Sequence, residues 1–183
     1  MPSGEPDGES APPFFPQPGA SVSVPSSFSL DQIREAMVSL GADGMALPPP
    51  SFTTMGTEVV DYRPGAPETN LGAVLIVRIP NDERWRNPMG LMQGGALGMA
   101  VDNAIGPLSF LVAPPSSTTQ LALTYIAPVT PDMDAITVEA TFVQRAGRQL
   151  VFDAEVKGPD GTVLTVARAT NQVVRRPTAQ PTS

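Results

Sequence analysis

Hydrophobic and polar residues alternate most regularly in the last third of the chain. Two runs, starting at Ala135 and at Leu150, place apolar side chains at every second position. The apolar positions are Ile136, Val138, Ala140, Phe142, Leu150, Phe152, Ala154 and Val156. Short turns at 145–148 and 158–161 separate these runs from each other and from a third run over 162–174. A period of two with tight turns predicts an antiparallel meander of three strands.

Three earlier apolar runs, at 53–62, 70–79 and 118–127, also predict strands. Between the second and the third lies a segment of helical length, 93–105, which Gly106-Pro107 is expected to end. Its apolar stripe at i, i+4 and i+8 consists of Leu97, Val101 and Ile105. A helix this apolar is buried. The pattern therefore predicts an α+β fold in which an antiparallel sheet wraps around one long helix.

The ends of the chain have a different composition. Residues 1–27 are rich in Pro, Gly and Ser, which predicts a disordered tail. Ser29 is a candidate N-cap for a short leading helix, and a proline-rich linker follows it. We therefore divide the chain into the tail, a leading helix and linker at 28–50, a main domain at 51–176, and a flexible C-terminus at 177–183.

Composition excludes several kinds of chemistry. The chain of 183 residues contains no cysteine and no histidine, which removes thiol nucleophiles, the Ser-His-Asp triad and histidine-ligated metals. We expect no metal and no cofactor. The net charge of −7 argues against nucleic acid as a partner. No apolar signal region and no unbroken apolar run of about 18 residues is visible, so we expect a cytoplasmic protein without a membrane span.

Asp102 is the only charged residue between positions 87 and 131. An unpaired carboxylate on a buried helix is costly, so this residue needs a partner or a function. It shares one helical stripe with Gly95, Gly98 and Gly106, and these small residues leave a groove where a backbone, a helix or a ligand can approach. The pattern fits a functional carboxylate or a structural one that bonds a neighbouring loop, and the two interpretations are about equally favoured.

Two consecutive glycines, Gly94 and Gly95, follow Gln93 at the start of this helix. Free backbone N–H groups at the positive end of a helix dipole can hold an anion or a developing oxyanion. A purely conformational role for the glycines is equally compatible with the pattern. The segment is neither a phosphate-binding Walker loop nor a dinucleotide fingerprint, because it lacks their residues and setting.

The segment from Asn87 to Ala104, NPMGLMQGGALGMAVDNA, resembles the signature of the PaaI-like hotdog-fold acyl-CoA thioesterases. That signature runs Asn, Gly, His-Gly-Gly and then an acid eight residues after the first glycine of the pair. Gly94 and Asp102 have this spacing. The run LTYIAP at 123–128 is similar to the third strand of the family, and the resemblance extends over roughly 53–174.

The resemblance implies a hotdog fold, in which the sheet is the bun and the buried helix the sausage. It also implies roles for four residues. Asp102 would be the nucleophile or the base that activates water, and the Gly94 amide would polarise the thioester carbonyl. Asn87 would position water or the carbonyl, and Thr118 would orient the acid or the water. In such a site, Asn87 and Gly94 of one subunit face Asp102 and Thr118 of another.

Gln93 stands where the family usually has histidine. Glutamine can donate and accept hydrogen bonds but gains no proton near neutral pH. We favour retained activity, because the proposed oxyanion donor is a backbone amide. Met92 and Gly95 are further candidates for substrate contacts. Arg145 and Arg148 are candidates for the CoA phosphates, although solvated surface charges are the commoner outcome for such residues.

The resulting hypothesis is a thioesterase that hydrolyses acyl-CoA or aroyl-CoA, with a role in fatty acid metabolism. It would act as a homodimer or homotetramer with its site at the dimer interface. The alternative is a catalytically silent hotdog protein that binds acyl-CoA or serves as a scaffold, and the absence of histidine keeps this alternative open. A hydratase is disfavoured for the same reason.

Overall fold

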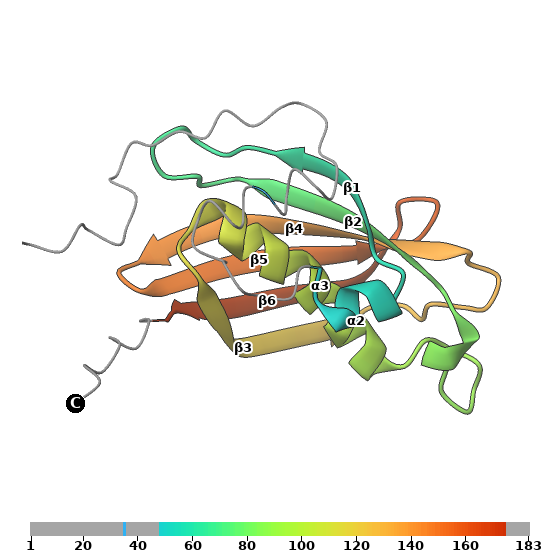
Figure 1. Cartoon of the computed structure of the whole chain (residues 1–183). Coiled ribbons are helices and arrows are strands. Elements are labelled where there is room, and N and C mark those ends of the chain that lie inside the picture. Colours follow the sequence, from blue (N-terminus) through green and yellow to red (C-terminus); the bar gives the residue numbers. More distant parts are fainter. Residues whose placement is uncertain (1–34, 36–47, 175–183) are drawn as a thin grey trace, which may run out of the picture.

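The computed structural model describes residue 35 and residues 48–174 of the chain (Figure 1). The predicted tail, leading helix and flexible C-terminus lie outside these residues, so the proposed domain boundaries there remain predictions. The helical elements are α2 (Pro50–Thr54), the 3-10 helix η1 (Glu83–Trp85) and α3 (Gly94–Val112). The strands are β1 (Glu58–Arg63), β2 (Val74–Pro80), β3 (Ser116–Tyr125), β4 (Ala135–Ala146), β5 (Gln149–Lys157) and β6 (Val163–Val173).

The six strands form one sheet in the order β1-β2-β4-β5-β6-β3, and every neighbouring pair is antiparallel. The predicted meander is confirmed as β4-β5-β6. The β4–β5 turn contains Gly147 at φ 59°, a conformation that glycine adopts without steric cost. Strand β3 lies at one edge of the sheet, where it pairs with β6 (Figure 1).

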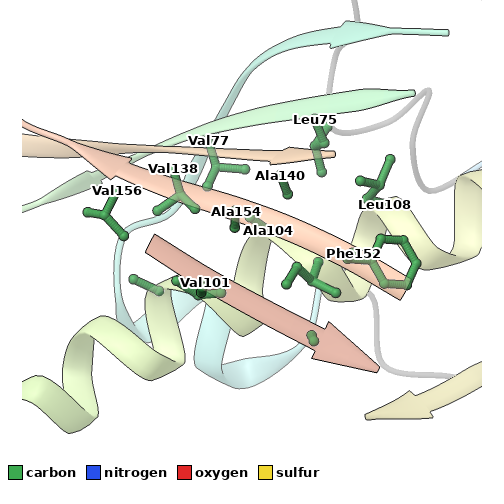
Figure 2. Close-up of a cluster of buried hydrophobic side chains, with 14 of the residues drawn as sticks. Leu75, Val77, Val101, Ala104, Leu108, Val138, Ala140, Phe152, Ala154 and Val156 are labelled. Carbon is green, nitrogen blue, oxygen red and sulfur yellow. The ribbon is translucent and has the colours of Figure 1, made fainter. Parts of the chain in front are cut away.

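The core lies between one face of the sheet and α3. Figure 2 shows Val101, Ala104 and Leu108 of α3 beside buried side chains from β2, β4 and β5. The rings of Phe142 and Phe152, on adjacent strands, lie 5.3 Å apart. By length and composition α3 could cross a membrane, but most of it is buried as the core helix. The predicted sheet around one long buried helix is therefore confirmed.

The helix α3 does not end at Gly106-Pro107 as predicted but continues to Val112. Proline in a helix interior removes one backbone hydrogen bond. Here Pro107 and Leu108 are buried under the sheet, and that burial offsets the missing bond. Ser109 Oγ also donates to the carbonyl of Gly106 at 2.7 Å. Tertiary packing therefore overrides the local stop signal.

The first predicted strand begins too early in the sequence. Residues 53 and 54 belong to the short helix α2, which has Pro50 at its first position, where proline is well tolerated. The side chains of Phe52 and Met55 are buried there. The second strand likewise starts at Val74 rather than residue 70, because Asn70 takes a turn conformation at φ 56°.

Candidate functional site

The N-terminus of α3 presents two consecutive backbone donors. Gln93 is the extended N-cap, and its carbonyl accepts from the amides of Ala96 and Leu97 at 2.9 and 3.1 Å. The amides of Gly94 and Gly95 donate to no atom within residues 48–174. Both N–H groups lie at the positive end of the helix dipole, so together they can stabilise an oxygen that carries developing negative charge.

Tyr125, at the end of β3, covers the first residue of this helix. Its Oη donates to the carbonyl oxygen of Gly94 at 2.9 Å. A Cβ atom added to Gly94 would lie 2.9 Å from Tyr125 Oη and 3.0 Å from its Cζ, which is closer than side chains pack. A side chain at position 94 would therefore require the exposed ring of Tyr125 to move.

Tyr125 is a residue of this site that sequence reasoning missed. The available signal was its place in the matched run at 123–128, together with the two-residue period that puts Leu123 and Tyr125 on the same face of β3.

Asp102 and Thr118 lie together at the other end of the same helical stripe. Thr118 Oγ1 donates to Asp102 Oδ1 at 3.0 Å. A bulge follows Thr118 in the β3–β6 ladder, where the register shifts before Gln120. The extra residue changes the direction in which side chains of the strand point. Thr118 pairs in register with the buried Asn171, and its side chain points toward α3. The structure thus brings together the acid and the hydroxyl that the resemblance pairs.

Asp102 is exposed in the isolated chain, rather than buried as its apolar neighbourhood suggested. The reason is its position on the side of α3 that faces the edge strand β3. Within its stripe, a Cβ added to Gly95 or to Gly106 would meet no atom within 4 Å, and one added to Gly98 would meet only Leu123 at 3.9 Å. This glycine-lined side of α3 is therefore open to solvent in the isolated chain.

One of the buried polar residues of α3 is its neighbour Asn103, which is 5% exposed. Its Oδ1 accepts from Ser51 Oγ at 3.1 Å, and its Nδ2 lies 3.3 Å from Thr57 Oγ1 and 3.4 Å from the carbonyl oxygen of Ser51. These bonds tie α3 to α2 and fix the rotation of the helix about its axis. Asn103 could not be distinguished from Asp102 in the sequence, because only its tertiary contacts show that it is the buried residue of the two.

The remaining candidates before α3 have mainly backbone or core contacts. Asn87 Oδ1 accepts from the amides of Met89 and Leu91 at 2.9 and 3.2 Å, which shapes the loop. The Gln93 side chain is exposed. Met92 is 4% exposed and belongs to the core, so its side chain does not face a ligand in the isolated chain.

The two arginines lie at the β4–β5 hairpin. Arg148 donates twice to the carbonyl of Val173, at 3.1 and 2.8 Å, and Arg145 donates to Gly147 at 3.2 Å. The pairing register, followed from β4 through β5 and β6 to β3, places Arg145 and Thr118 in the same row of the sheet. Three strand spacings separate the two residues, which is about 14 Å. The arginines are therefore nearer to the acid end of the stripe than to the amide end.

A single chain does not assemble the whole set of predicted residues. Gly94 and Asp102 are eight residues apart on α3, about 12 Å along its axis. The amides and the carboxylate of one chain therefore cannot act on the same small group.

No protein-family model matches the chain, and no curated protein sequence matches it. Solved structures do. The PaaI protein of the E. coli phenylacetic acid degradation operon aligns with a TM-score of 0.60 at 14% identity, over 77% of this chain and 95% of that one. A mutant thioesterase from Staphylococcus aureus aligns at 0.59 and 17%, over 68% and 98%. A hypothetical thioesterase from Streptococcus pneumoniae, solved with coenzyme A, aligns at 0.57 and 19%, over 67% and 91%. The chain therefore has the hotdog fold.

Proposed function

We propose that this chain, which shares the hotdog fold of PaaI, hydrolyses thioesters of coenzyme A to a free carboxylic acid and CoA. The observation that carries the proposal is one stripe of α3, which presents two amides without an acceptor in residues 48–174 at one end and a hydroxyl-bonded carboxylate at the other. The signature spacing and the coenzyme A bound to the S. pneumoniae protein support the same ligand class.

The proposal requires a second copy of the chain. Strand β3 is an edge strand whose residues are mostly exposed, and its outer side is available for pairing with another strand. A two-fold axis near Gly98, midway between Gly94 and Asp102, would make the two α3 helices antiparallel. The amides of one subunit would then face the carboxylate of the other across the glycine-lined sides of the two helices. We therefore propose a homodimer, with pairing of dimers into a tetramer as a further possibility of the fold.

In the proposed reaction, the thioester oxygen accepts hydrogen bonds from the Gly94 and Gly95 amides. Thr118 binds Oδ1 of Asp102, which leaves Oδ2 free to act. This oxygen either attacks the carbonyl carbon, forming a mixed anhydride that water then hydrolyses, or removes a proton from an attacking water. In both routes the C–S bond breaks and CoA leaves as a thiolate, a good leaving group because a thiol has a pKa of about 8.5.

The other candidate residues support this chemistry without a proton transfer. Asn87 shapes the loop before α3, and its amide nitrogen can still donate to the carbonyl or to water. The exposed Gln93 supplies hydrogen bonding in place of the family histidine. Arg145 and Arg148 lie at the acid end of the stripe, where their charges suit the phosphates of CoA. We also propose a cytoplasmic location, where acyl-CoA is available.

The second candidate function is a silent acyl-CoA-binding or scaffold protein. The complete absence of histidine favours it, because Gln93 cannot carry a proton. Thiol release from a panel of short, long and aromatic acyl-CoAs, followed with a thiol-reactive dye, separates the two functions. Turnover supports the thioesterase, whereas saturable binding measured by calorimetry without thiol release supports the silent binder.

A further inference from the structure

The two glycines at the start of α3 differ in what explains them. At Gly94, a Cβ would lie 2.9 Å from Tyr125 Oη, so a side chain there would displace the tyrosine ring. Gly95 is an ordinary helical residue without positive φ, and a Cβ there would meet no atom within 4 Å. Alanine at this position would stabilise the helix by about 0.5–1 kcal/mol. No contact within the described residues therefore explains why position 95 is glycine. A glycine here would allow a ligand to approach the backbone closely.

The carbonyl that Tyr125 binds belongs to the same peptide unit as the Gly95 N–H. Because a peptide unit is planar, a hydrogen bond that holds its oxygen also fixes the direction of its N–H. A bonded carbonyl further polarises the peptide, and hydrogen bonds in a chain strengthen one another by roughly 10–30%. The 2.9 Å bond from Tyr125 Oη to the Gly94 oxygen therefore acts on the Gly95 amide.

We propose that Tyr125 is a positioning residue that makes the Gly95 amide the second oxyanion donor beside Gly94. The inference rests on the proposed thioester hydrolysis. Tyr125 does not touch the reacting carbonyl in this scheme, because its proton is directed to the Gly94 oxygen. It acts on the reaction through the orientation and donor strength of one peptide group.

The first test is Tyr125→Phe, which keeps the ring over Gly94 and removes only the hydroxyl. The matched control is Tyr62→Phe, which removes the same atom from β1 at the opposite edge of the sheet. Loss of a whole oxyanion donor costs about 10²–10³ in kcat. A misdirected donor should cost less, so we expect kcat of Tyr125→Phe to fall about tenfold with KM changed less than about twofold. The control should keep wild-type kcat.

Two further measurements separate this role from a structural one. In ¹⁵N-glycine-labelled protein, Tyr125→Phe should shift the amide resonances of Gly95 and of Gly98, whose helical N–H donates to the same Gly94 carbonyl, and leave glycines outside α3 unchanged. Gly95→Ala should keep or raise the melting temperature, since its methyl group finds open space, while kcat falls at least tenfold because the methyl group crowds the donor. A variant that is more stable yet slower is not explained by loss of packing.

The outcomes distinguish this inference from the function on which it rests. If the wild type hydrolyses acyl-CoA and Tyr125→Phe keeps kcat within about twofold, the inference is overturned and the thioesterase stands. Full activity of Gly95→Ala would also overturn it, even if Tyr125→Phe failed to fold. If the wild type releases no thiol, the proposed function fails and the donor role fails with it. The Gly95 resonance then still shows whether Tyr125 orients this peptide.

Discussion

Replacing Asp102 with asparagine separates a catalytic carboxylate from a structural one. The side chain is exposed, and its bond within the described chain is the one that Thr118 Oγ1 donates to Oδ1 at 3.0 Å. Asparagine retains an Oδ1 that accepts this bond, so the loss of stability should stay below about 1 kcal/mol. The charge that attacks the thioester or activates water is removed.

We expect turnover of Asp102→Asn to fall at least about 100-fold, the low end for removing a positioned acid–base group. A 100-fold fall corresponds to about 2.7 kcal/mol of activation free energy. The dissociation constant for acyl-CoA should change little, since the proposed contacts with the amides and arginines remain. The rise in activation free energy should therefore exceed the loss of folding free energy, and the difference should be larger than the uncertainty of either measurement.

The assay is thiol release under saturating acyl-CoA, with urea unfolding and calorimetric binding on the same preparation. Asp61→Asn is the matched control. Asp61 is also a partly exposed carboxylate with a 3.0 Å bond, from Arg63 Nε, but it lies on β1 at the far edge of the sheet. Unchanged turnover of Asp102→Asn would remove this residue from the mechanism. A destabilised variant with a proportionate loss of activity would assign it a structural role.

Three further predictions follow from the contacts described above. Light scattering at micromolar concentration should give at least about twice the 19.1 kDa of one chain, and a fully active monomer would contradict the shared site. Asn103→Ala should lower the free energy of unfolding by about 1–3 kcal/mol, because Thr57 and Ser51 lose a buried partner; an unchanged urea midpoint would refute this. Hydrogen bonds from Arg168 lower the pKa of Asp153, so their stabilising contribution is present above the unfolded pKa and is lost as pH falls through the folded one. The urea midpoint of Asp153→Asn should therefore fall less steeply with decreasing pH than that of the wild type. An equally steep fall in both proteins would show that the Asp153–Arg168 pair does not contribute to stability.

The regular alternation of the last three strands was sufficient to predict their pairing. One face of each strand must be buried, and a slip of one residue would expose every apolar side chain. The segment between the second and third strands could be identified as a buried helix because it carries a single charge. Asp102 was found as the lone charge of this segment and the glycine pair from its place at the start of the helix, and their spacing then matched the family signature.

The residues that sequence reasoning missed are those whose importance comes from contacts between distant segments. Tyr125 lies 31 residues from the carbonyl that it binds, and Asn103 lies 52 residues from Ser51. Local signals were also overridden by burial at Pro107, where packing against the sheet keeps α3 intact. The same packing set the exposure of Asp102, because the rotation of α3 decides which side of the helix meets the edge strand.

The sequence by itself thus determined which segments form strands, which segment forms the central helix, and which residue types stand at the spacing of the candidate site. These features depend on local periodicity and on burial of one face, both of which can be recognised from the order of apolar and polar residues. The tertiary structure decided the ends of the helices and the partners of Asp102. It also revealed the tyrosine that holds the first peptide of α3 and the 12 Å separation that calls for a second subunit. Those features arise only when distant side chains compete for the same space and for the same hydrogen bonds.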